Sequence, residues 1–148
     1  MSQVVVERLS NAMRSAIERL PQQRLPGGRA TFPAGNCLPA SLLLGAYLAD
    51  SGVPGFECAY GQRSPAEGKL ITHVWLTNGD LLADITADQF EEVSSSVIVT
   101  RSSDWHQTFW ISGFGASDFR EMTERTNQSF RELSLVYDQL RPFLFQGS

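Results

Sequence analysis

The sequence predicts a single α+β domain in which helices pack on a mostly antiparallel sheet. Three features favour this class: apolar residues recur at helical spacing near both ends, one segment is apolar almost all round, and an Asn-Gly pair separates two apolar runs. The chain has 148 residues without a break in composition, which suits one domain over residues 1–148. Hydrophobic residues make up 42%, a balance too apolar for a disordered chain.

Two helices are expected in the first third of the chain. An amphipathic helix is predicted over residues 3–20, and a glycine- and proline-rich loop over residues 21–35. A second helix is expected over residues 37–51, because Asn36 is a good N-cap and Pro39 is compatible only with a first turn. The apolar stripe of the first helix consists of Val6, Leu9, Met13, Ile17 and Leu20.

Strands are expected to follow at residues 55–61, 70–77, 80–86 and 97–101. Asn78-Gly79 joins the second and third of these runs and is the strongest short hairpin signal in the chain. Residues 62–69 are predicted to be a polar loop, and residues 102–116 an aromatic connection that contains glycines. A final helix is predicted to begin after Ser117 and to end at Pro142. Its inward stripe would be Phe119, Met122, Thr126, Phe130, Leu133, Tyr137 and Leu140.

Composition excludes several classes of function. The net charge is −4 and Lys69 is the only lysine, so the basic stripe that nucleic-acid binding needs is missing. No apolar run approaches the roughly 20 residues of a membrane-spanning helix. The N-terminus does not resemble a secretory signal, which favours the cytoplasm or export without such a signal. Two cysteines are too few for a disulfide scaffold or a structural zinc site, and we expect no metal and no organic cofactor.

The predicted hairpin brings two polar residues together. If Asn78 and Gly79 are the loop residues, His73 pairs with Asp84 and Trp75 pairs with Leu82. Directly opposite residues of an antiparallel pair share a face, with Cβ atoms about 4.5–5.5 Å apart. The carboxylate of Asp84 can then accept a hydrogen bond from the imidazole of His73. A one-residue slip would put the two on opposite faces.

Cys37 is the candidate nucleophile. A cysteine at a helix N-terminus lies at the positive end of the helix dipole, near backbone N–H groups that have no acceptor in the helix. Both features favour the thiolate, which is the reactive form. We therefore expect Cys37 to attack, His73 to transfer the proton, and Asp84 to orient His73 and stabilise its imidazolium.

The same residues resemble the transglutaminase-like thiol enzymes, which have a papain-like fold. Gly35-Asn36-Cys37, the apolar helix to Gly52-Val53 and Cys58-Ala59-Tyr60-Gly61 are similar to the nucleophile helix and the strand that follows it in that superfamily. Thr72-His73-Val74-Trp75-Leu76 and Leu82-Ala83-Asp84-Ile85-Thr86 resemble its histidine and aspartate strands. The block Phe32–Phe90 is also similar to a group of small bacterial proteins of unassigned role. The resemblance implies amide chemistry on a protein or peptide: glutamine deamidation, proteolysis or crosslinking.

Each candidate residue also has a structural interpretation. His73 can be a core histidine satisfied by Asp84, and Cys58 is expected to be a buried core residue. Asn36 either caps the helix or donates to an oxyanion, and Trp75 either roofs the site or packs in the core. His106 is a rival base or a cleft residue, although a surface loop position is its default interpretation.

The predicted function is acyl transfer or hydrolysis of an amide through a thioester on Cys37. A small domain of this kind is consistent with a protein-modifying effector. The alternative is a catalytically inactive module that binds a protein through the cleft or through the aromatic segment 105–114. An arylamine-type acyltransferase would use the same triad, but the sequence contains no glycine loop or basic cluster for an acyl carrier. The sequence does not indicate an oligomeric state.

Overall fold

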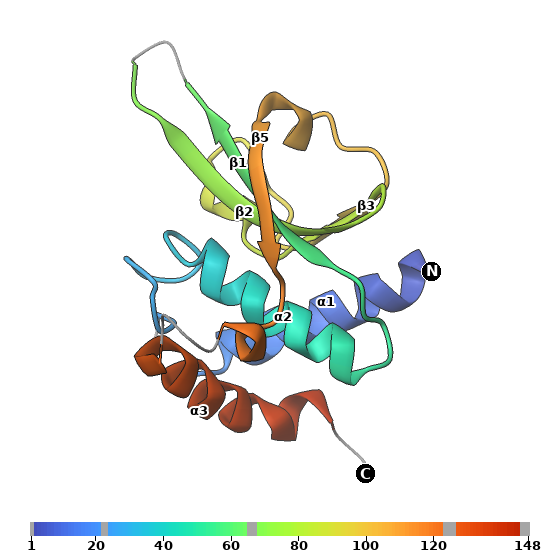
Figure 1. Cartoon of the computed structure of the whole chain (residues 1–148), viewed down its shortest axis with the longest axis vertical. Coiled ribbons are helices and arrows are strands. Elements are labelled where there is room, and N and C mark those ends of the chain that lie inside the picture. Colours follow the sequence, from blue (N-terminus) through green and yellow to red (C-terminus); the bar gives the residue numbers. More distant parts are fainter. Residues whose placement is uncertain (1, 22–23, 65–67, 123–126, 146–148) are drawn as a thin grey trace.

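A five-stranded antiparallel sheet packs against a layer of helices, which confirms the α+β class. The computed structural model describes residues 2–21, 24–64, 68–122 and 127–145. The three α-helices lie in the lower half of Figure 1 and most of the sheet lies in the upper half. The three α-helices are α1 (Gln3–Glu18), α2 (Cys37–Asp50) and α3 (Asn127–Leu144).

Helices α1 and α2 confirm their predictions to within two residues at each end. The third helix was placed too early, because the chain first forms a 3-10 turn, Phe119–Glu121, in which Asp118 caps the backbone N–H of Arg120. Pro142 does not end α3; it lies in the last turn, where a missing backbone N–H removes only one helical bond. Of the predicted stripe, Leu133, Tyr137 and Leu140 are buried, whereas Thr126 and the Phe130 side chain lie outside the described residues.

The sheet has the strand order β4-β3-β2-β1-β5, and all neighbouring strands are antiparallel. The strand at residues 110–116 was not predicted, since Gly113 and Gly115 disfavour a strand and its apolar side chains are exposed rather than alternating into a core. It forms one edge of the sheet, where it pairs with the first strand. The five strands are β1 (Glu57–Arg63), β2 (Ile71–Asn78), β3 (Leu81–Asp84), β4 (Ile98–Thr100) and β5 (Trp110–Ala116).

The register of the β2–β3 hairpin differs from the prediction. Asn78 pairs with Leu81, so the two loop residues are Gly79 and Asp80, and Gly79 takes the positive φ of 60° that such turns favour. The predicted pairing of Trp75 with Leu82 is therefore wrong, because Leu82 pairs with Thr77. The shift amounts to two residues, and a two-residue shift leaves every side chain on its predicted face.

Side chains from both faces of β2 are buried, because the sheet is covered on both sides. Val74 and Leu76 belong to the main core between the sheet and the helices. Trp75 belongs to a second cluster with Ala59 and Phe109, against which Phe90 and Trp105 pack. The second cluster is closed by the segment between β3 and β5. This segment carries Gln89 and His106, and only its last part, residues 102–109, belongs to the connection predicted over residues 102–116.

Close packing of the strands depends on a glycine in β1. A Cβ atom on Gly61 would lie 2.7 Å from the Trp75 ring and 3.0 Å from Phe109. Gly61 pairs with His73 in the β1–β2 ladder. The absent side chain therefore lets the aromatic cluster approach the backbone beside His73.

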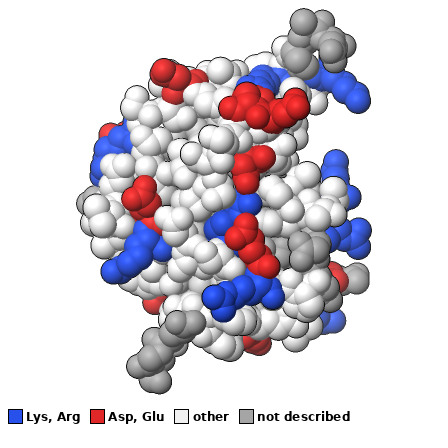
Figure 2. All heavy atoms as spheres, turned by 180° about the vertical axis from the view of Figure 1, so that it is seen from behind, with Lys and Arg blue, Asp and Glu red and all other residues white. Residues whose placement is uncertain are grey.

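Acidic and basic side chains alternate over the face seen from behind in Figure 2, and its described residues form no continuous basic surface. Several arginines pair with carboxylates, as in Arg63 with Glu92 at 2.7 Å and Arg120 with Asp50 at 2.9 Å. Among the described helices, none is long and apolar enough to cross a membrane.

Candidate active site

Cys37, the first residue of α2, lies at the wall of a cavity of about 430 Å³. This volume is in the range of small-molecule and side-chain binding pockets, about 300–1,000 Å³. The loop before α2, the first turn of α2, the middle of β1 and β2, Gln89 and Ser112 form its walls. We call this cavity the Cys37 cleft. His73 lines it as well, so two of the three predicted catalytic residues meet in one cavity.

The loop that leads to Cys37 is held by the buried side chain of Asn36. Its Oδ1 accepts a hydrogen bond from the backbone N–H of Leu25 at 2.8 Å, and its Nδ2 donates to the carbonyls of Ala30 and Ala34 at 2.9 and 2.7 Å. Asn36 stands at the predicted N-cap position of α2, but its side chain performs neither of the two functions expected of it. Its side chain makes no helix-capping bond, and both amide hydrogens are bound, so neither is available for an oxyanion.

The N-terminus of α2 has uncapped backbone N–H groups beside the cleft. The Asn36 side chain does not cap the helix, and the N–H groups of Cys37 and Leu38 have no acceptor within the described residues. Pro39, the next residue, has no N–H group. Cys37 and Leu38 both line the cleft. These two groups are suited to hold a negative oxygen that develops on a carbonyl bound next to the sulfur.

His73 and Asp84 contact each other as predicted, although by a different route. His73 Nε2 lies 2.7 Å from Asp84 Oδ2. In the observed register Asp84 is one diagonal position from the residue opposite His73, and a carboxylate spans that diagonal easily. The Asp84 Oδ1 atom accepts a hydrogen bond from the Thr86 N–H at 2.9 Å. Both side chains are almost fully buried, so the carboxylate is fixed in position.

His106 is a third member of this buried cluster, which corrects its default interpretation as a surface histidine. It is 4% exposed, and its Nε2 lies 2.7 Å from the same Asp84 Oδ2 atom. The Ser103 hydroxyl lies 2.6 Å from His106 Nδ1 and also accepts the His106 backbone N–H at 3.1 Å. Ser103 and Asp84 thus each contact one ring nitrogen of His106 and fix the orientation of its ring. His106 does not line the Cys37 cleft.

The charges of the cluster stabilise one another. Burial alone lowers the pKa of His73, but the charge and hydrogen bond of Asp84, with smaller contributions from Cys37, raise it to about 9. Burial alone raises the pKa of Asp84, but His73 and the hydrogen bonds from both histidines lower it well below its usual range. At neutral pH the site therefore holds an imidazolium bound to a carboxylate.

The raised pKa of His73 makes the stability of the protein depend on pH. The folded state holds this proton more tightly than the unfolded chain, so the contribution is full below pH 6.5 and is lost as pH rises through about 9. We expect the free energy of unfolding to fall by about 3 kcal/mol from this group between pH 6.5 and pH 10. Urea unfolding across this range measures the loss. A His73→Gln variant, which lacks the titrating group, is expected to show a flatter profile, and an equal slope in both proteins would contradict the assignment.

The second ring nitrogen of His73 faces the cleft. Nε2 is bound to Asp84, so Nδ1 is the ring nitrogen of His73 that can serve Cys37, whose proximity contributes to the raised pKa of His73. The Gln89 amide is also near this atom, with Nε2 at 3.3 Å. Gln89 further accepts the Gly35 N–H at 3.3 Å and donates to the Thr86 carbonyl at 3.1 Å. It links the Cys37 loop to the histidine strand.

Sequence reasoning did not single out Gln89. The one sequence feature that could have drawn attention to Gln89 is its position five residues after Asp84. In the structure it lies on a short 3-10 turn, Ala87–Gln89. Trp75, in contrast, lies on the predicted face: its ring centroid is 5.7 Å from that of His73 and 4.8 Å from that of His106. Trp75 is 4% exposed and packs against the two histidines. It is therefore a core residue and does not cover the site.

His73, Asp84 and His106 also form a set that can hold a metal ion, with ligand atoms within 4.8 Å of one another. Each Nε2 lies 2.7 Å from the carboxylate oxygen, the length of a hydrogen bond between a charged pair. The remaining Asp84 oxygen and the His106 Nδ1 atom have partners of their own. The cluster thus has the geometry of a hydrogen-bonded network in which every polar atom is satisfied.

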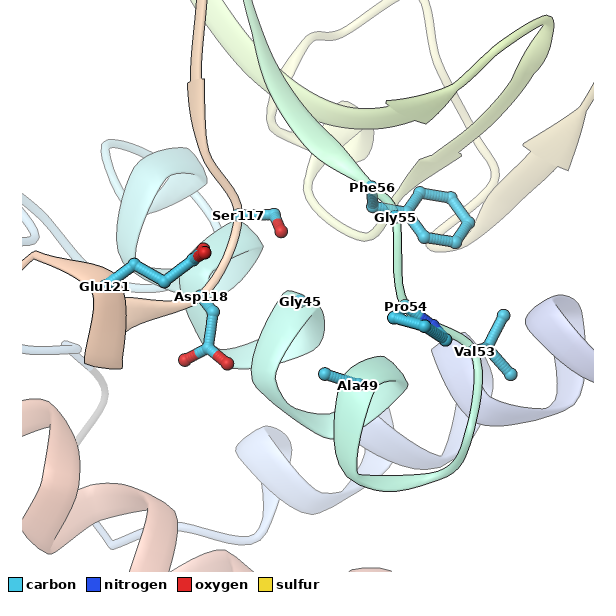
Figure 3. A pocket seen from close by; sticks show the side chains of 9 residues that line it. All are labelled: Gly45, Ala49, Val53, Pro54, Gly55, Phe56, Ser117, Asp118 and Glu121. Atoms are coloured by element: carbon cyan, nitrogen blue, oxygen red, sulfur yellow. The ribbon is translucent and has the colours of Figure 1, made fainter.

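A second cavity, of about 240 Å³, lies beside the C-terminal half of α2 (Figure 3). It is lined by residues 53–56, which lead into β1, on one side and by Ser117, Asp118 and Glu121 on the other. No predicted site residue lines it. Cys58 lies in the main core, fully buried, and burial raises its pKa to about 12, as expected for a structural cysteine.

Comparisons of the chain with protein-family models, with curated proteins and with solved structures gave no match.

Proposed function

We propose that this protein is a thiol enzyme that transfers the acyl group of an amide to water or to an amine. Cys37 is the nucleophile, His73 the acid and base, and Asp84 the residue that orients His73. One observation carries the proposal: Cys37 and His73 line the same cavity, and the opposite nitrogen of His73 is bound to a buried carboxylate. The finer fold assignment, papain-like and transglutaminase-like, belongs to the same proposal.

The reaction has two halves. The Cys37 thiolate attacks the amide carbon, and the N–H groups of Cys37 and Leu38 hold the resulting oxyanion. His73 gives its Nδ1 proton to the departing nitrogen, so that ammonia or an amine leaves and a thioester remains. His73, now neutral, accepts a proton from the incoming water or amine, which attacks the thioester and frees the sulfur. Asp84 stays ionised throughout and stabilises the imidazolium.

The acceptor decides the outcome of the second half. Water gives deamidation of glutamine or cleavage of a peptide bond, and an amine gives a crosslink. All three share the thioester and need no organic cofactor. Tyr60, Gln62 and Ser112 also line the cleft, and its volume of about 430 Å³ suits a side chain or a segment of a protein or peptide substrate.

A generic acyl donor tests the nucleophile without knowledge of the substrate. Incubation with p-nitrophenyl acetate is expected to release a rapid burst of nitrophenolate and to leave an acetyl group on Cys37, seen by mass spectrometry of peptides. Cys37→Ser should abolish the burst, whereas Cys58→Ala should retain it, because Cys58 is buried and has a pKa raised to about 12. The burst should also survive a metal chelator. Acetylation elsewhere, or loss of the burst with the chelator, contradicts the proposal.

The alternative is a catalytically inactive module that binds a protein partner. Trp110, Ile111 and Phe114 of β5 are exposed, at 51%, 42% and 57%, and all three lie within the aromatic segment 105–114. An unreactive Cys37 in the acetylation experiment would favour this module over the enzyme.

A further inference from the structure

The Cys37 cleft contains one permanently charged side chain, Arg29. Among the described residues that line the cleft there is no aspartate, glutamate or lysine. Arg29 is exposed, and within the described part of the chain it has no carboxylate partner. Arg14, Arg63 and Arg120, in contrast, are all paired with carboxylates.

The backbone of Arg29 is held in place next to the nucleophile. Its N–H donates to the Gly35 carbonyl at 3.1 Å, and Asn36 binds the carbonyl of the next residue, Ala30, at 2.9 Å. Gly35 has a φ of 70°, and a Cβ there would lie 3.2 Å from the Arg29 Cβ. The loop therefore brings the base of the Arg29 side chain against the residues that immediately precede Cys37.

The other groups at the cleft add to the positive potential. The N-terminus of α2 contributes the positive end of a helix dipole, and His73 is protonated at neutral pH because its pKa is raised to about 9. Once the thiolate forms, its negative charge is balanced by the positive charge of His73. The Arg29 guanidinium then has no counter-charge in the cleft. A guanidinium binds a carboxylate through two parallel hydrogen bonds and is well suited to this task.

From this arrangement we infer that Arg29 makes the cleft selective for substrates that carry a carboxylate close to the reacting carbonyl, such as an acidic peptide segment. This inference rests on the proposed function, because it describes the substrate of the same thiol. The guanidinium binds and orients the anion beside Cys37, and takes no part in bond making.

Two small alkylating reagents of similar size test the inference. Iodoacetate carries a carboxylate and iodoacetamide does not, and each forms a bond with the Cys37 sulfur and releases iodide. The ratio of their second-order rates cancels changes in the thiolate population. Arg29→Gln is expected to lower the iodoacetate-to-iodoacetamide ratio about fivefold, the size expected for one charge at a partly solvated site. Arg29→Lys, which keeps the charge, should retain most of the ratio. Arg24→Gln, which removes an exposed charge of the same loop outside the cleft, should leave it unchanged.

The outcomes separate the inference from the proposed function. If Cys37 reacts with both reagents and Arg29→Gln has the same rate ratio as the unmodified protein, Arg29 does not select for carboxylates. The proposal that the protein is a thiol enzyme is unaffected by this result. An equal decrease in Arg24→Gln would attribute the effect to general surface charge and also overturn the role of Arg29. If neither reagent reacts with Cys37, the proposed function fails, and the inference fails with it.

Discussion

Replacing His73 by glutamine is expected to lower the rate of Cys37 acetylation at pH 7 by about a thousandfold, within the range of general acid–base catalysis. A glutamine amide can still donate a hydrogen bond to Asp84, but it cannot carry a proton to or from the reacting groups. The measurement is the burst rate with p-nitrophenyl acetate, accompanied by thermal unfolding to verify that the variant is folded.

His106 provides the matched comparison for this experiment. It binds the same carboxylate oxygen but does not line the cleft, so His106→Gln is expected to change the rate far less than His73→Gln. Equal losses in the two variants would mean that the histidines act only by holding the fold. A larger loss in His106→Gln would assign the base to His106.

Removal of the Asp84 carboxylate is expected to give the largest loss of stability. In Asp84→Ala, the N–H groups of His73, His106 and Thr86 lose their acceptor in a buried site, and a buried imidazolium loses its counter-charge. Breaking a buried charge pair by removal of one partner costs about 3–5 kcal/mol. Urea unfolding at pH 7 measures this difference.

Two variants help to interpret the Asp84 result. Asp80→Ala removes an exposed aspartate whose contact with Arg101 is 3.5 Å, and its expected effect is within about 0.5 kcal/mol. Asp84→Asn keeps the volume and one acceptor oxygen, but brings an NH₂ group against either the Thr86 N–H or the histidine N–H groups. It is expected to be more stable than Asp84→Ala and still inactive. An Asp84→Ala protein as stable as Asp80→Ala would contradict the role of the buried cluster.

The contact between His73 and Asp84 could be predicted because it depends only on which face of the hairpin each side chain occupies, and the error in register did not change those faces. The Asn-Gly signal located the hairpin, but the loop residues are Gly79 and Asp80 rather than Asn78 and Gly79. Since strand side chains alternate with a period of two, the two-residue shift left His73 and Asp84 on one face. The contact therefore held, although the pairing behind it was wrong.

The rest of the site comes from contacts between segments far apart in the sequence, to which local patterns are insensitive. His106 lies 22 residues from Asp84, in a connection without strand periodicity, and its burial depends on the aromatic cluster that covers the second face of the sheet. Gln89 depends on the packing of a single 3-10 turn against the Cys37 loop. Asn36 has the composition of a cap, but its side chain is taken by the loop that precedes it.

The position of β5 at the border of the sheet has a consequence for the protein in concentrated solution. Its outward backbone groups have no partner strand among the described residues, and three large apolar side chains stand exposed along it. Borders of this kind are templates on which a strand of another molecule can add. We therefore expect molecules of this protein to associate through this border as the protein is concentrated.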